Sequence, residues 1–174
     1  SLQKLSQNLH ENDAADLVVG QAGVLAVAVD LARMCSGKSF AVDEVMEEIV
    51  SRCLPVLDRY FRETLSESLD IDRYTGFAHG LAGILASLSA ASTVLQPRSP
   101  LRNRVELVVQ EMINSLCGRV EDNGAVGRST MDNRKDAAWC HGAPGVLLGL
   151  TIAKENGFRC SRAVLDRLAD YVKY

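Results

Sequence analysis

Four side chains in this sequence could carry out chemistry together: Asp16, His79, Cys140 and His141. Each stands just before a glycine-rich turn that leads into an apolar stretch. A cysteine beside a histidine at a helix start is a plausible metal or nucleophile site, since the helix N-terminus favours a thiolate. Histidine side chains can move protons near neutral pH. These residue types indicate a polar site that contains a thiolate.

The turn that carries these residues occurs three times, which suggests an internal repeat. Its first glycines are Gly20, Gly80 and Gly142, spaced 60 and 62 residues apart, and each is followed by a second glycine three residues later. The residue before the first glycine is a valine in the first turn and a histidine in the other two. If the three turns gather on one rim, Asp16, His79, Cys140 and His141 face a common basin.

The elements that would position these residues repeat with the turns. Each unit contains a turn, an apolar helix, a loop and an amphipathic helix, and no alternating run favours a strand. Pairs of this kind predict the inner and outer helices of an all-α, α/α toroid, here an incomplete arc of about three helix-pair repeats. We expect one domain over residues 1–174, with repeats that start near residues 16, 76 and 138. The predicted helices cover 24–31, 41–68 (with Pro55 inside), 84–91, 101–117, 145–154 and 161–173, and a long loop covers 118–137.

Composition limits the classes of function. The chain has 174 residues, 47% of them hydrophobic and 24% charged, with a net charge of −3, which is typical of a globular domain. The scattered basic residues form no stripe for nucleic acid, and no apolar run is long enough to span a membrane. The odd count of five cysteines favours free thiols in a reducing, cytoplasmic compartment. Those other than Cys140 are expected to be buried small hydrophobes: Cys35, Cys53, Cys117 and Cys160.

Each candidate residue has a purely structural alternative. Asp16 is a typical helix cap. His79 and His141 could be turn histidines whose rings bond to backbone, and Cys140 could be a buried thiol. One cysteine and two histidines at this spacing match no recognised zinc motif. His10, in the polar segment 1–15, is expected to be a surface histidine, and residues 36–39 a loop.

The motifs in the three turns carry a family resemblance. They are W-C-H-G-A-P-G at residues 139–145, G-F-A-H-G-L-A-G at 76–83 and D-L-V-V-G-Q-A-G at 16–23. In this order they resemble the LanC-like lanthionine cyclases, most closely the C-terminal cyclase domain of class II (LanM-type) lanthipeptide synthetases. The resemblance extends over nearly the whole chain and implies an α/α toroid with a central zinc ion.

The resemblance also implies roles for single residues. Cys140 matches a zinc ligand of the family, His79 matches its acid/base histidine, and Asp16 matches an aspartate of the same basin. His141 is a secondary catalytic candidate. The other two zinc ligands come from a later C-H-G motif, which does not follow Cys140 in this sequence, so we expect them C-terminal to this chain. Where some members carry an arginine, four residues before the cysteine, this chain has Asp136, with Arg134 and Lys135 nearby.

The implied chemistry belongs to lantibiotic biosynthesis. A peptide cysteine thiol adds to dehydroalanine or dehydrobutyrine, which forms a lanthionine or methyllanthionine thioether. The expected partners are a precursor peptide with a leader and a dehydrated core, and an upstream dehydratase domain. We expect the fragment alone to be inactive. A non-catalytic LanC-like protein that binds thiols or glutathione is the alternative; an α/α-toroid glycosidase or a terpene-cyclase-like protein would need paired carboxylates, and only Asp16 is present on the rim.

Overall fold

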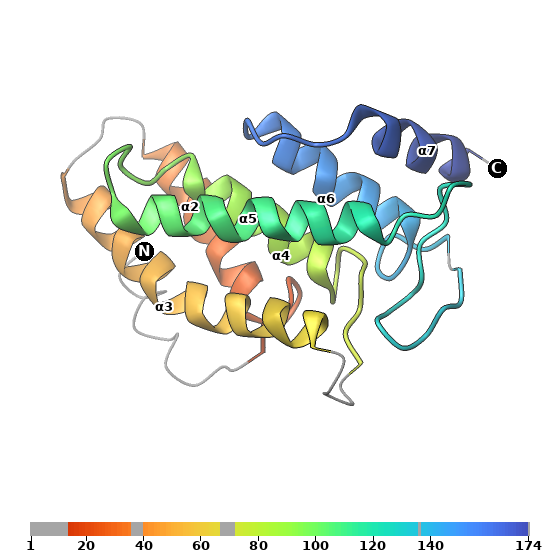
Figure 1. Cartoon of the computed structure of the whole chain (residues 1–174). Helices are drawn as coiled ribbons and strands as arrows, with labels where there is room; N and C mark the ends of the chain where they lie inside the picture. Colours follow the sequence, from red (N-terminus) through yellow and green to blue (C-terminus); the bar gives the residue numbers. More distant parts are fainter. Residues whose placement is uncertain (1–13, 36–39, 67–71, 136, 174) are drawn as a thin grey trace.

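The computed structural model describes residues 14–35, 40–66, 72–135 and 137–173, and its regular elements are helices (Figure 1). Within these ranges one isolated β-bridge joins Tyr74 to Ser129, and no strand is present. The all-α prediction is therefore confirmed for the described part of the chain. The helices are α2 (Gln21–Met34), α3 (Phe40–Leu65), α4 (Leu81–Ser92), α5 (Pro100–Gly118), α6 (Ala143–Glu155) and α7 (Arg162–Val172).

Several expectations fall outside the described residues. They concern His10 and the rest of 1–13, the loop 36–39, the end of the helix predicted over 41–68, and Asp136. In the described ranges, no helix combines the length and the apolar character needed to cross a bilayer.

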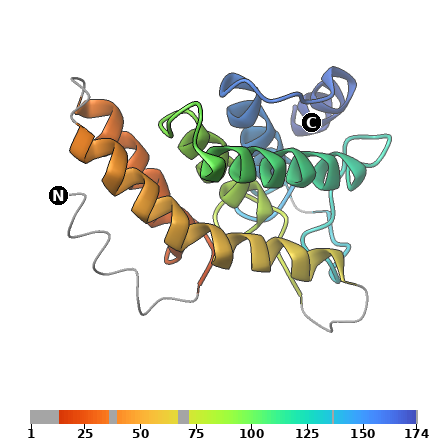
Figure 2. The ribbon, with the colours of Figure 1, turned by 60° about the vertical axis from the view of Figure 1, so that its left-hand side comes forward.

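The helices form two layers. In Figure 1 and Figure 2, α2, α4 and α6 lie side by side in one layer, with α4 in contact with both of the others. In the second layer, α3, α5 and α7 each pack against the helix that precedes them in the chain. The three pairs α2/α3, α4/α5 and α6/α7 thus form the predicted arc of inner and outer helices.

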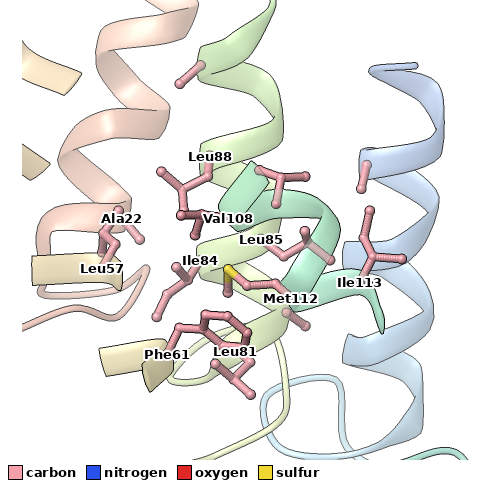
Figure 3. Close-up of a cluster of buried hydrophobic side chains, with 14 of the residues drawn as sticks. Ala22, Leu57, Phe61, Leu81, Ile84, Leu85, Leu88, Val108, Met112 and Ile113 are labelled. Carbon is pink, nitrogen blue, oxygen red and sulfur yellow. The ribbon is translucent and has the colours of Figure 1, made fainter. Parts of the chain in front are cut away.

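The core is centred on α4, which explains its apolar, small-residue sequence. Every residue of this helix except Ala90 is buried. Figure 3 shows leucine and isoleucine side chains of α4 between side chains from α3 and α5, including Phe61 and Met112. Burial of each large aliphatic side chain stabilises the fold by about 1.5–3 kcal/mol. A helix that is covered on all sides needs no polar face, so its sequence lacks the amphipathic pattern of α7.

Inner and outer helices begin in different ways. The outer helices α5 and α7 have serine N-caps, Ser99 and Ser161, whose side chains accept backbone N–H bonds. The inner helices have glycine N-caps in extended backbone, without a side-chain cap. The preceding loop satisfies the first amides of α4, because Leu81 N donates to the Tyr74 carbonyl at 3.0 Å. Each glycine turn thus provides the N-cap of the inner helix that follows it.

The second glycine of each turn allows close backbone contact. A carbonyl oxygen six residues earlier in the chain occupies the space where a side chain would begin. This contact recurs in all three repeats and gives the G-x-x-G pattern a physical reason. A Cβ atom would lie 2.2 Å from the Leu17 oxygen at Gly23, 2.0 Å from the Phe77 oxygen at Gly83 and 1.9 Å from the Trp139 oxygen at Gly145.

The five cysteines are free thiols, but of the four that we expected to be buried, only Cys53 is fully buried. Cys35 is exposed, because it follows the last turn of α2. Cys53 is fully buried in α3, and Cys117 and Cys160 are half-buried. Burial raises the pKa of all three of these thiols, that of Cys53 to about 12 and that of Cys160 to about 11. They therefore remain protonated near neutral pH.

The buried Cys53 thiol predicts an alkaline loss of stability. Its pKa rises from 9.0 to about 12 on folding, so its contribution is complete below pH 9 and declines as the pH rises toward 12. For this group alone, the free energy of unfolding falls by about 1 kcal/mol between pH 9 and pH 10. Urea unfolding at these two pH values measures the loss. Cys53→Ala is less stable than wild type at pH 7, but its free energy of unfolding falls less between pH 9 and pH 10. An equal fall in both proteins contradicts the role of the Cys53 thiol in this pH dependence.

Candidate functional site

The three glycine-rich turns lie next to one another. Phe77 N donates to the Trp139 carbonyl at 3.0 Å, and Leu17 N donates to the Ala78 carbonyl at 3.1 Å. These bonds connect the second turn to the third and the first turn to the second. Residues that are about 60 positions apart in sequence therefore meet at the N-terminal ends of α2, α4 and α6.

The first pair in the site is Asp16 and His79. One carboxylate oxygen of Asp16 accepts bonds from the amides of Val18 and Val19, each at 2.8 Å. Its other oxygen lies 3.7 Å from Nδ1 of His79, and the His79 side chain is 41% exposed. The capping alternative is thus partly right, since Asp16 caps the turn while Gly20 is the N-cap of α2. The same carboxylate has both a structural contact and a contact with the candidate acid.

The second pair is His141 and Cys140. The rings of His79 and His141 are stacked, with centroids 6.0 Å apart and planes 26° from parallel. Nδ1 of His141 lies 3.1 Å from Sγ of Cys140, which is partly buried. The structure therefore brings the four candidate side chains together in the order Asp16, His79, His141, Cys140.

Two neighbours of this row were missed by sequence reasoning. The ring of Tyr74 lies 4.8 Å from the His141 ring, and the guanidinium of Arg128 lies 5.6 Å from the centre of Tyr74. Gly76 makes room for the row, because a Cβ there would lie 2.4 Å from both the Cys140 oxygen and the His141 Cα. The sequence alignment of the turns could have indicated this, because Gly76 occupies the position that Asp16 occupies in the first turn.

Trp139 differs from its counterparts in the other turns. Leu17 and Phe77 pack against the core, as we expect for hydrophobic anchors of a turn. Trp139 is 54% exposed, and its ring lies over Phe77 with centroids 6.1 Å apart. The backbone of Trp139 therefore holds the turn while much of its ring faces solvent.

A zinc ion can be tested against the donors present. Thiolate and imidazole are preferred zinc donors, and a catalytic zinc has three protein ligands. Cys140 provides one such group, and Nδ1 of His141 lies 3.1 Å from its Sγ. Among the residues that the structure describes, no group of three His, Cys, Asp or Glu side chains could hold a metal ion. These residues fit part of a zinc site and do not complete one.

The basic residues before the third turn bind other side chains. Arg134 binds Asp132 through both carboxylate oxygens, and these bonds hold the pKa of Asp132 down at about 2. Nζ of Lys135 bonds to Glu121 and Asn133. Both basic groups thus contribute to the structure of the 119–135 loop.

Comparison with known protein families gives a match that includes all three turns. The family model described as "Lanthionine synthetase C-like protein" matches residues 1–170. The chain belongs to the lanthionine synthetase C-like family. Membership indicates a lanthionine cyclase-type function with peptide substrates, and it agrees with the all-helical arrangement of paired helices. Asp16, His79, Cys140 and His141 all lie within the matched residues.

Two substitutions of Asp16 separate its two contacts. Asp16→Ala removes the acceptor for two backbone amides, so it lowers the free energy of unfolding by about 1 kcal/mol. Asp16→Asn keeps an oxygen acceptor and loses the charge beside His79, so its loss is less than about 0.5 kcal/mol. Chemical denaturation of the two variants measures this difference. Equal losses contradict the capping role of the carboxylate.

Proposed function

We propose that the row of side chains from Asp16 to Cys140 belongs to the active site of a lanthionine cyclase. The reaction joins a cysteine thiol of a peptide to a dehydroalanine or dehydrobutyrine of the same peptide. The observation that supports it most strongly is that a carboxylate, two imidazoles and a thiol meet at adjacent turns of a family member. Such a row places groups for thiol activation and for proton transfer next to each other.

The addition has two requirements that the row can meet. The substrate thiol must lose its proton before its sulfur bonds to the β-carbon, and the C=C electron pair then moves to give an enolate. The enolate must gain a proton at the α-carbon, so atoms balance and the product is an isomer of the substrate. A thiol-activating group and an acid are both needed.

Cys140 lies at the thiol-activating end of the row. We assign it as one ligand of a zinc ion whose other ligands lie beyond the described residues. When bound, zinc would lower the pKa of a substrate thiol, as it does for ligands of this kind in general. His141, at hydrogen-bond distance from Sγ, orients Cys140 and separates it from His79.

His79 lies at the acid end of the row. Its ring is partly exposed, so it can reach a substrate, and one carboxylate oxygen of Asp16 lies 3.7 Å from its Nδ1. We assign His79 as the group that gives a proton to the enolate carbon, with Asp16 as its partner. General acids of this type contribute roughly 10²- to 10⁴-fold to a rate.

The proposed substrate, partner domain and compartment follow from the same proposal. The motifs resemble class II synthetases, so we propose a precursor peptide with a leader and a dehydrated core as substrate, and a dehydratase domain as partner. The site works in the cytoplasm, where its thiols stay reduced, and the five cysteines of the chain carry no disulfide.

Thiol capping tests the proposed function. The natural protein that carries residues 1–174 is incubated with a dehydrated peptide and zinc, and N-ethylmaleimide is then added. Ring formation consumes the peptide thiols, so the wild-type product takes up no maleimide, whereas His79→Gln leaves thiols that react. Lys173→Gln, at the residue that follows α7, is the control and behaves as wild type. Full capping in the wild-type reaction, with the peptide bound, contradicts the proposal and favours the thiol-binding alternative.

A further inference from the structure

The backbone of the second turn is held by a side chain from the outer layer. The hydroxyl of Tyr60, on α3, donates to the carbonyl of His79 at 3.3 Å. The Tyr60 ring lies under the guanidinium of Arg73, 4.7 Å from the ring centre, and Arg73 pairs with Glu63 at 2.5 Å. Tyr60 is thus fixed on two sides, and its hydroxyl contacts the residue whose ring faces Asp16.

The backbone of the third turn is held in a similar way. Thr75 is buried, and its hydroxyl lies 3.1 Å from the carbonyl of His141. The same hydroxyl lies 2.7 Å from the Gly127 carbonyl and 3.2 Å from that of Arg128. Its single proton has three carbonyl acceptors within reach, of which Gly127 is the nearest, so the hydroxyl links the irregular 119–135 segment to the third turn.

We propose that Tyr60 and Thr75 are positioning residues that fix the His79 and His141 rings in their stacked arrangement by holding the two histidine carbonyls. Neither residue touches the candidate reacting groups, so neither is a catalytic residue. The inference deepens the proposed function, on which its kinetic part rests.

Two physical points support this assignment. Burial raises the pKa of Tyr60 to about 12, so its hydroxyl remains a donor throughout the working pH range. A turn lacks the continuous hydrogen bonds of a helix, so the position of a turn side chain depends on the few bonds that its own backbone makes. An error of about 1 Å in the position of a reacting group can lower a rate by roughly 10²-fold.

NMR of labelled histidine rings tests the positions without any reaction. The 174 residues contain three histidines, and in the ¹³C-histidine spectrum of the natural protein the signals lost in His79→Gln and in His141→Gln assign these two rings. At one fixed pH, Tyr60→Phe shifts the His79 signal and Thr75→Val shifts the His141 signal, because ring-current effects depend on the stack. Thr75→Ser keeps the hydroxyl and restores the wild-type spectrum.

Two control variants lose the same kind of hydroxyl at positions away from the two histidines. Tyr171→Phe changes a partly buried tyrosine of α7, and Thr64→Val removes a buried hydroxyl that bonds to the Phe61 carbonyl. Both leave the histidine signals in place. Unchanged histidine signals in Tyr60→Phe and Thr75→Val, or equal shifts in the controls, overturn the inference.

Kinetics of the natural protein complete the test. Tyr60→Phe and Thr75→Val each lower kcat by about three- to tenfold, with KM within about twofold of wild type, and Thr75→Ser recovers most of kcat. Shifted signals with an unchanged kcat overturn the positioning role. A wild-type protein that forms no thioether contradicts the proposed function instead, while the NMR result still decides whether the two hydroxyls hold the rings.

Discussion

Cys140→Ala is expected to remove bound zinc and to lower thioether formation more than about 100-fold. Loss of groups that merely orient a ligand weakens metal binding or activity by about 10–100-fold, so loss of a direct ligand has a larger effect. Elemental analysis of the purified natural protein measures the metal, and maleimide capping of the peptide measures the reaction. Cys140 is partly buried, its Sγ lies 3.1 Å from Nδ1 of His141, and it is outside the hydrophobic core cluster of the described residues, so the substitution disturbs little core packing.

Cys35→Ala is the matched control for this substitution. Cys35 is an exposed free thiol at the end of α2. Its replacement keeps zinc content and rate at the wild-type level, which separates the loss of a ligand from the loss of any thiol. Full zinc content in Cys140→Ala contradicts the ligand assignment, whatever the rate of that variant.

Gly83→Ala is expected to destabilise the fold by about 3 kcal/mol or more. Its Cβ would lie 2.0 Å from the Phe77 oxygen and 3.2 Å from the Leu17 side chain, so the backbone of two turns must move. Loss of this size is a large part of the total stability of a domain. Because the displaced turns carry Asp16 and His79, the pair separates as the helix start shifts. Urea unfolding measures the stability of the variant.

Gly118→Ala is the control for Gly83→Ala. Gly118 is the last residue of α5, and no atom lies within 4 Å of a Cβ built there. Alanine is the better helix former, so this variant has unchanged stability or gains up to about 1 kcal/mol. Equal stability of the Gly83 and Gly118 variants would show that the close backbone contact in the turn is unimportant.

The helices could be predicted because their sequence signals are local. Apolar spacing located α5 within one residue at each end. The inner helices begin earlier than their apolar runs predicted, by three residues for α2 and α4 and by two for α6, at the residue after the first turn glycine. Burial of single residues was harder to predict. Cys35 follows the last turn of α2 and Trp139 lies in the turn before α6; both are exposed, and at such positions the sequence pattern does not reveal the neighbours.

The proximity of the four candidate side chains could be predicted from the sequence. Alignment of the three turns was enough to place Asp16, His79, Cys140 and His141 on one rim, because equivalent turns have equivalent positions. The order of the row and its distances depend on tertiary contacts. Tyr60 and Thr75 gave no signal, since a tyrosine on an amphipathic helix and a threonine before a turn are ordinary residues. Their proposed role depends on contacts that the sequence does not reveal. Tyr60 contacts the carbonyl of His79, and Thr75 contacts that of His141 in another turn.

Reaction in D₂O tests the central claim most directly. If a peptide thiol adds to a dehydro residue and the enolate takes its proton from the site, each new thioether carries one deuteron at the α-carbon, in a single configuration. Mass spectrometry and chiral analysis of the hydrolysed product measure both. We predict this result for the natural protein, with ring formation at least tenfold slower in His79→Gln. Thiols that remain free, or rings that form equally fast and with the same configuration in His79→Gln, would contradict the account.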